Sequence, residues 1–342
     1  MPSSSFRHCA VADPNHGISS KKRPAARIPN ILTILFSQAS QARTHLYNLY
    51  LITLDDTPTF VVPNTVFGVS SAFTSSMVKA TDSAALVSLG FSWRLCFVVL
   101  QTVIFNWTNL LIFDLANQRQ SGEEDAHNKP WRPIPSGRLT SIQMRHLLMA
   151  AIPVVLTYNH FVLSVGTESC LLAILTWLYN DLGGGDDNWL IRNLIIGCAF
   201  GVYNLGSLKV AATTSAAVSG AFAVSPMGYY WTAIISLVIF TTMHVQDLKD
   251  IKGDAARGRR SAPIVLGRRA AGWTIAVPVV LWSSVCPLFW RSPAWVAWVP
   301  AAVGMCVAWR CVRVSGEWTD RRTWQLWCAW TAVLYVLPPL SA

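Results

Sequence analysis

Long apolar stretches separated by polar links make up most of the chain after residue 45. Apolar runs of about 20 residues match a helix that crosses roughly 30 Å of hydrocarbon. The pattern predicts nine such helices, over residues 58–78, 92–116, 144–164, 166–180, 190–210, 228–246, 270–290, 294–312 and 322–340. A further stretch of small apolar residues, 211–224, continues the fifth range and leaves the helix count open by one. We therefore expect an all-α, polytopic membrane protein.

Composition supports the membrane interpretation. Hydrophobic residues make up 52% of the 342 positions and charged residues only 13%, about half the share of a soluble globular domain. The charges gather in a few links instead of following many amphipathic faces. Residues 1–44 are rich in Ser, Pro and basic residues, and no apolar run follows closely enough for a signal peptide. We expect a disordered basic tail there and a single transmembrane domain over 45–342.

The distribution of basic residues predicts the orientation. The links after the second and sixth ranges are strongly basic, whereas the alternate links are nearly bare, with Lys79 in one and Arg291 in another. The positive-inside rule places the basic links in the cytosol, and the endoplasmic reticulum is a suitable membrane. Topology thus accounts for the net charge of +10 without a nucleic-acid partner.

Polar side chains recur with helical spacing in the first basic link. Asp114, Asn117 or Gln118, Ser121, and Glu124 or Asp125 follow one another at three or four residues, so a continuing helix would turn them to one face. Acidic groups at the end of a spanning helix are costly unless they face a water-filled cavity or bind a ligand. For this link alone, a solvated helix end remains the alternative.

The second basic link repeats this arrangement. Asp247, Asp250 and Asp254 lie on one face of a predicted helix, where their charges repel. A hard divalent cation relieves such repulsion, and Mg²⁺ binds through one or two carboxylates together with substrate phosphates. Lys249, Arg257 and Arg259 lie nearby, and an arginine can hold phosphate oxygens by two hydrogen bonds.

Together, the two links resemble the UbiA superfamily of intramembrane prenyltransferases. The family's first motif, NDxxDxxxD followed by NxPxRPIPSG, is matched by Asn117 to Asp125 and by the run NKPWRPIPSG from Asn128 to Gly137. Its second acidic motif is matched by Asp247, Asp250 and Asp254, with Pro263 to Gly267 trailing. The resemblance covers roughly residues 45–340, and both motifs occur in the family's order.

The resemblance implies about nine transmembrane helices around a central cavity that holds Mg²⁺ and a prenyl diphosphate. By position, the implied metal ligands are Asn117, Glu124, Asp125, Asp247, Asp250 and Asp254. The implied diphosphate-binding residues are Lys129, Arg132, Lys249 and Arg257. The catalytic carboxylates would be Asp125, Asp247, Asp250 and Asp254.

The chain also departs from the family pattern. Gln118 and Ser121 stand where the first motif usually has aspartates, and the link after the fourth range reads LYNDLGGGDDNWLIRN without the Tyr-Lys-Arg stretch of relatives that prenylate 4-hydroxybenzoate. Together with HVQDLKD in the second motif, this combination is similar to a fungal branch that includes UbiA-type terpene cyclases.

Ionisation of an allylic diphosphate begins both chemistries that this resemblance implies. In a cyclase a double bond of the same chain traps the cation, whereas in a transferase an aromatic or other small acceptor does so. We expect a cyclase of secondary metabolism acting on farnesyl or geranylgeranyl diphosphate, and keep the transferase as the alternative. A transporter is a distant third, since neither inverted repeats nor broken helices are evident.

Two further groups of residues are candidates without a settled role. His244, one turn before Asp247, is either a base for the terminating proton or a structural hydrogen-bonding residue. Several aromatic residues line the cavity or simply pack in the bundle: Phe105, Trp107, Phe113, Tyr203, Phe222, Tyr229, Tyr230 and Trp231.

Overall fold

The computed structural model describes residues 31–80, 93–216 and 222–341. The chain forms two compact units, Met1–His45 and Leu46–Ala342. Helix α1 (Ile31–Thr53) begins in the first unit and ends in the second. Residues 31–44, which we expected in the tail, are therefore helical, because the stretch from Ile31 contains neither glycine nor proline. Residues 1–30 lie outside the described part, and the tail remains a prediction there.

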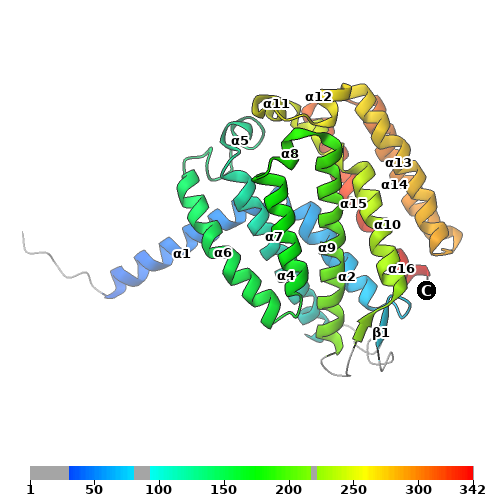
Figure 1. The fold of residues 1–342 in the computed structure, drawn as a ribbon, viewed down its shortest axis with the longest axis horizontal. Coiled ribbons are helices and arrows are strands. Elements are labelled where there is room, and N and C mark those ends of the chain that lie inside the picture. Colours follow the sequence, from blue (N-terminus) through cyan, green and yellow to red (C-terminus); the bar gives the residue numbers. More distant parts are fainter. Residues whose placement is uncertain (1–30, 81–92, 217–221, 342) are drawn as a thin grey trace, which may run out of the picture. The chain divides into compact units, whose positions relative to one another are not determined.

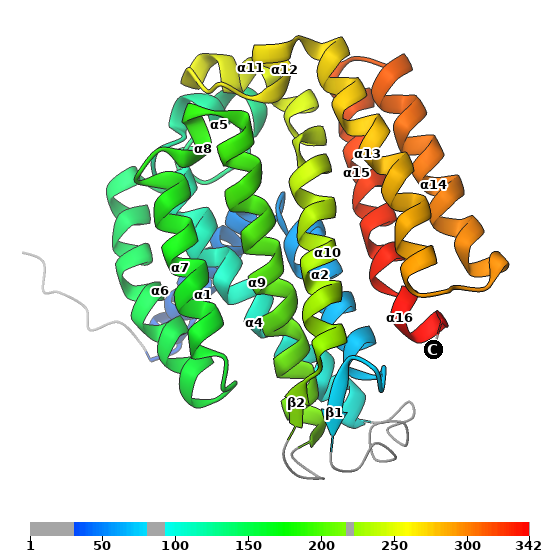
Figure 2. The same ribbon diagram turned by 45° about the vertical axis from the view of Figure 1, so that its right-hand side comes forward.

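The second unit is built from long helices (Figures 1 and 2). They are α2 (Thr57–Ala72), α4 (Trp93–Gln118), α6 (Ser141–Phe161), α7 (Gly166–Asn180), α9 (Trp189–Ala216), α10 (Pro226–Thr242), α13 (Arg268–Phe289), α14 (Ala294–Arg313) and α15 (Glu317–Tyr335). Each predicted range overlaps one of these helices, which confirms the all-α class.

Within the described ranges, five helices are long and apolar enough to cross a membrane: Trp93–Gln118, Trp189–Ser215, Pro226–Val245, Arg268–Phe289 and Ala294–Arg313. Others fall short for simple reasons. Helix α2 has 16 residues and α7 has 15, below the roughly 20 that span the hydrocarbon without thinning it. The integral membrane class is confirmed, and the count of nine spans stays a prediction.

Short elements connect the long helices. At one end of the second unit lie α5 (Gly122–Asn128), α8 (Gly184–Asp187), α11 (Asp247–Arg257) and α12 (Ala262–Leu266), and a small ribbon lies at the other end (Figure 2). The ribbon pairs β1 (Val78–Ala80) with β2 (Phe222–Val224) in antiparallel register. Sequence analysis missed it because three-residue strands carry no periodic signal. The 3₁₀ turn η1 (Met243–Val245) precedes α11, and α16 (Leu337–Ser341) ends the described chain.

Helices α2, α4 and α9 pack closely at the centre of the second unit. A Cβ atom at Gly68 would lie 2.5 Å from the backbone of Ser207, so only glycine lets α2 and α9 approach this closely. Asn106 of α4 ties the other two helices together, donating to Thr65 Oγ1 at 3.1 Å and accepting from Ser207 Oγ at 3.0 Å. This closely packed centre also carries part of a cavity wall, with Phe60 on α2, Phe113 on α4 and Tyr203 on α9.

Candidate active site

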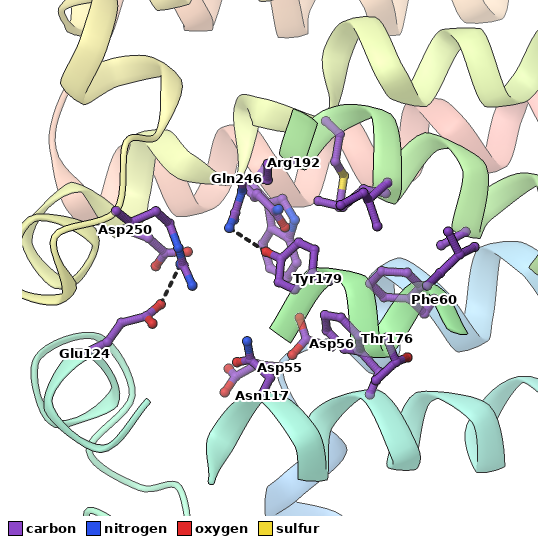
Figure 3. A pocket seen from close by; sticks show the side chains of 18 of the residues that line it. Asp55, Asp56, Phe60, Asn117, Glu124, Thr176, Tyr179, Arg192, Gln246 and Asp250 are labelled. Carbon is purple, nitrogen blue, oxygen red and sulfur yellow. Dashed lines mark hydrogen bonds and ion pairs between the residues drawn. The ribbon is translucent and has the colours of Figure 1, made fainter. Parts of the chain in front are cut away.

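A cavity opens between the α5–α11 end and the central helices. Polar and charged residues line one part of it: Asp55, Asp56, Asn117, Glu124, Lys129, Arg132, Arg192, Gln246, Lys249, Asp250, Arg259 and Arg321. The other lining residues are Phe60, Phe113, Leu172, Leu175, Thr176, Tyr179, Ile195, Ile196, Ala199, Tyr203, Met243 and Trp324. Figure 3 shows Glu124 and Asp250 on one side and Phe60 on the other. The cavity is therefore polar at one end and largely apolar at the other.

The two acidic links meet at the polar end. Asn128, at the end of α5, accepts a hydrogen bond from the Gly253 amide at 3.2 Å and donates to the Asp250 carbonyl at 3.3 Å. No larger residue replaces Gly253 without conflict, since a Cβ atom there would lie 2.1 Å from the Asn128 amide nitrogen. Residues from both predicted motifs thereby line one cavity: Asn117, Glu124, Lys129, Arg132, Lys249 and Asp250.

The other predicted residues, Asp125, Asp247, Asp254 and Arg257, surround the cavity without lining it. The three aspartates are buried, and each pairs with an arginine that does line it. The pairs are Asp125–Arg132 at 2.9 Å, Asp247–Arg192 at 2.9 Å and Asp254–Arg259 at 2.7 Å. A buried charge is strongly destabilising without a partner, so these carboxylates face guanidinium groups. The second oxygen, Oδ2, of each has no hydrogen-bond partner among the described residues.

Ion pairs among four charged residues join α5, α8 and α11: Glu124, Asp186, Arg257 and Arg259. Arg257 donates to Glu124 at 3.0 Å and to Asp186 at 2.9 Å. Arg259 contacts the same two carboxylates at 2.9 Å each. Gly183 takes a left-handed conformation, φ 72°, just before α8, and this turn is easiest for glycine. The glycine-rich link therefore has a defined place beside the motifs, which spacing alone did not reveal.

The basic residues keep most of the carboxylates at the cavity ionised. Burial alone would raise the pKa of Asp56, but Lys129 and Arg132 outweigh it and lower that pKa to about 2. Burial likewise opposes ionisation of Asp250, and Lys249 and Lys129 overcome it, so the pKa of Asp250 is lowered. These carboxylates are fully charged at neutral pH.

Asp247 behaves differently from Asp250 although both belong to the same motif. Burial raises the pKa of Asp247 to about 6, and the nearby charge of Asp254 adds to that rise, against the attraction of Arg192. Asp250 sits at the cavity wall beside Lys249, at 2.5 Å. The structure thus gives Asp247 and Asp250 different environments, although their spacing in the sequence predicts the same one.

The oxygen-rich lining suits a hard divalent cation. Asn117, Glu124 and Asp250 offer amide and carboxylate oxygens, the ligand type that Mg²⁺ prefers. Within the described ranges, however, no three His, Cys, Asp or Glu side chains converge closely enough to hold a metal ion. Glu124 and Asp250 instead contact arginine and lysine. The donor chemistry therefore fits, and metal binding would require these ion pairs to exchange.

Sequence analysis missed Asp55 and Asp56 in the α1–α2 link. Arg132 donates to Asp56 at 2.9 Å, and the Trp131 indole donates to Asp55 at 3.1 Å. These bonds attach the NKPWRPIPSG segment to the start of α2. The signal was present, since adjacent aspartates directly follow an apolar run, as in the two recognised links.

The structure distinguishes cavity-lining aromatic residues from exposed ones, and it also shows what His244 contacts. Phe113 and Tyr203 line the cavity, whereas Tyr229 and Tyr230 are exposed on the outside of α10. Phe60, which was not predicted, packs on Tyr203 with ring centroids 5.5 Å apart. His244 is buried, and its two ring nitrogens contact Asn193 at 2.9 Å and Thr274 at 3.0 Å. These contacts favour the structural interpretation of His244.

Comparisons with known proteins agree with this architecture. The model of the UbiA prenyltransferase family matches residues 69–333. Somaliensene A/B synthase of Streptomyces somaliensis is 28% identical over 300 residues, covering 84% of this chain and 92% of that protein. Fumagillin beta-trans-bergamotene synthase of Aspergillus fumigatus is 30% identical over 264 residues, covering 75% and 80%.

An archaeal relative with a different product name matches over a similar length. Digeranylgeranylglyceryl phosphate synthase of Natronomonas pharaonis is 29% identical over 260 residues, covering 72% of this chain and 84% of that protein. A solved structure of a digeranylgeranylglyceryl phosphate synthase shares the fold, with a TM-score of 0.55 at 16% identity over 87% of this chain and 99% of that one. The resemblance inferred from the two motifs is thereby confirmed. This chain belongs to the UbiA prenyltransferase family, an enzyme family with terpene cyclases and prenyltransferases among its members.

Proposed function

We propose that this protein is a magnesium-dependent terpene cyclase that ionises farnesyl or geranylgeranyl diphosphate and closes the prenyl chain on itself. The observation that carries the proposal is the polarity of the cavity: residues of both acidic links line one end, and the remaining wall is mostly apolar. A prenyl diphosphate has the same division, with a charged head and an apolar tail. The basic links at the polar end of the cavity support a cytosolic opening by the positive-inside rule, in a membrane such as the endoplasmic reticulum.

The charged end would receive the diphosphate. Lys129, Arg132 and Lys249 line it. Arg257 does not line the cavity but forms an ion pair with Glu124, which does. Lys129 forms no salt bridge with any carboxylate of the described chain, so its ammonium group is available for a phosphate oxygen. When bound, Mg²⁺ would stabilise the negative charge of the departing pyrophosphate.

Asn117, Glu124 and Asp250 are the cavity-wall residues that would hold the metal. The predicted ligands Asp125, Asp247 and Asp254 lie one layer further out, where they orient Arg132, Arg192 and Arg259. We infer that these three carboxylates act mainly through their arginines.

The apolar part of the cavity favours cyclisation. Phe60, Phe113 and Tyr203 present aromatic rings, which stabilise a nearby cation and exclude water from it. The cavity volume, traced by the centres of water-sized spheres, is about 80 Å³, which is enough for several waters because one water needs roughly 10–15 Å³. A prenyl chain is much larger than a few waters. Side chains of the wall would therefore have to move when it binds and would then close around it.

The link after α7 offers little to an acidic acceptor. Asp181 pairs with Arg119, and Asn180 accepts a hydrogen bond from Asn117 at 2.9 Å. Arg192, the basic residue that follows this link, is already bound to Asp247. These contacts support cyclisation over transfer to an aromatic acid.

Prenyl transfer to another acceptor is the second candidate. It is supported by relatives named polyprenyl transferase and digeranylgeranylglyceryl phosphate synthase, which are 30% and 29% identical to this chain.

Incubation of purified protein with Mg²⁺ and each prenyl diphosphate, without acceptor, tests the proposal. Gas chromatography with mass spectrometry should detect a cyclic terpene, and the product should disappear when Mg²⁺ is chelated. Linear alcohol as the sole product, together with efficient prenylation of a supplied phenol, would assign the protein to the transferase group instead.

A further inference from the structure

Arg321 reaches the cavity from α15, a helix that neither acidic motif includes. Its side chain is partly buried and lines the polar end together with Trp324 of the same helix. The guanidinium carbon lies 5.6 Å from the centre of the Trp131 ring. An arginine on an aromatic face gains stacking and cation–π stabilisation. Arg321 is thereby held at the cavity without an acidic partner among the described residues.

The basic side chains of the wall fall into two groups. Arg132, Arg192, Lys249 and Arg259 each contact one or more carboxylates. Lys129 and Arg321 form no salt bridge with any acidic residue in the described ranges, although both line the same polar end. The first group is neutralised within the protein. The second has no carboxylate of the described residues within ion-pair distance, so its N–H groups are free to bind a ligand, while the charge of Lys129 also lowers the pKa of Asp56 and Asp250.

Trp131 holds Arg321 beside the segment that carries Lys129. It lies two residues after Lys129, donates its indole N–H to Asp55 at 3.1 Å, and presents its ring to Arg321. The hydrogen bond fixes the ring from one edge, so the ring can orient a guanidinium group against its face. A guanidinium whose flat side is occupied still has its N–H edge free for two parallel hydrogen bonds to a phosphate.

We propose that Arg321 and Lys129 form an anion subsite at the polar end of the cavity that binds a phosphate group, with Trp131 positioning Arg321. The ligand class follows from two available cations, one with the planar fork that suits phosphate oxygens. Its identification with the diphosphate of the prenyl substrate rests on the proposed function. A phosphate-bearing acceptor would use the same chemistry, and the experiment separates these sources.

Arg322 provides a matched control. It neighbours Arg321 on α15 and also stacks on a tryptophan, Trp318, at 5.0 Å. It is exposed and does not line the cavity. Arg321→Gln and Arg322→Gln therefore remove the same charge from almost the same place, and only the first removes a cation from the wall.

The test measures binding of inorganic pyrophosphate to the purified proteins by calorimetry, in the absence of turnover. Arg321→Gln should weaken binding about tenfold or more, the effect of losing hydrogen bonds to a charged group, and Arg322→Gln should change it less than about twofold. Trp131→Leu should weaken binding to an intermediate extent, and Trp131→Phe should recover part of the loss because it keeps an aromatic face. Thermal melting of each variant excludes a folding defect.

Equal losses in both arginine variants, or none in Arg321→Gln, would overturn the subsite, as would absence of pyrophosphate binding by the wild-type protein. Prenyl diphosphate turnover, measured in parallel, separates this from the proposed function. Wild-type turnover with unchanged pyrophosphate affinity in Arg321→Gln rejects the subsite alone. Arg321-dependent binding without turnover rejects the cyclase alone. Binding of glycerol phosphate, measured alongside, identifies the source of the phosphate: a larger loss in Arg321→Gln for glycerol phosphate than for pyrophosphate assigns the subsite to an acceptor, and the reverse assigns it to the prenyl diphosphate.

Discussion

Two buried polar regions of this protein are built from different side chains. At the α5–α8–α11 end, buried Arg132 contacts Asp55, Asp56 and Asp125. At the centre of the bundle, Asn106 contacts Thr65 and Ser207 with no charged group. Neutral hydrogen bonds hold helices in register at little electrostatic cost. Charged pairs are costly to bury but can exchange a partner for an ionic ligand, so their position marks the site.

Changing a carboxylate on the cavity wall should separate activity from stability most sharply. Asp250→Asn should reduce turnover about a thousandfold, since loss of a charge-stabilising group at a reacting centre typically has an effect of this size, while the melting temperature should fall less than in Arg132→Met, because only the ion pair with Lys249 is lost. Product formation with saturating Mg²⁺ measures it. Lys252→Gln is the control, because the Lys252–Glu317 pair lies on the surface of the same end. A loss of only a few-fold in Asp250→Asn would make this residue part of a solvated helix end.

Removing Arg132, the cation that Asp55, Asp56 and Asp125 share, should instead lower the stability of the fold strongly. Arg132→Met leaves Asp125 and its neighbours without their partner, and breaking a buried pair costs about 3–5 kcal/mol. Denaturation in detergent should show a loss of this order. Arg132→Met combined with Asp125→Asn should recover part of it, because the double variant no longer buries that unpaired charge. Stability close to wild type in the single variant would mean that water reaches these carboxylates.

Acid should act on the charged region and spare the neutral one. Because the pKa of Asp56 is depressed to about 2, its ionised form stabilises the fold above its unfolded pKa, near 4. That contribution, on the order of 2 kcal/mol, is lost as pH falls from about 4 through about 2. Melting curves across this window should show a shallower decline in Asp56→Asn than in wild type. Identical slopes would contradict the ion-pair assignment.

The neutral network should give the smallest effect. Asn106→Ala removes two hydrogen bonds between helices, and such bonds within membranes average about 0.6 kcal/mol each, so we expect a loss near 1 kcal/mol with turnover largely retained. Asn109→Ala, one turn away and bonded to Ser169, is a comparable change in the same helix. A large loss of activity in Asn106→Ala would show that the centre of the bundle shapes the cavity and does more than support it.

The sequence by itself determined the membrane class, the α-helical fold and the two acidic links. Apolar run length and helical spacing are local properties, and each predicted range has its counterpart among the described helices. The motifs also placed Asn117, Glu124, Lys129, Arg132, Lys249 and Asp250, which do line one cavity.

Tertiary structure decided which members of a motif face the cavity. Asp247 and Asp254 share a helical face with Asp250 by spacing, yet they turn to Arg192 and Arg259 because burying a charge requires a counter-charge from another helix. Asp56 lies near the beginning of the second unit's sequence and Arg321 near its end, yet both line the same wall. No local pattern specifies such partners, since they meet only when α2, α9, α11 and α15 pack together.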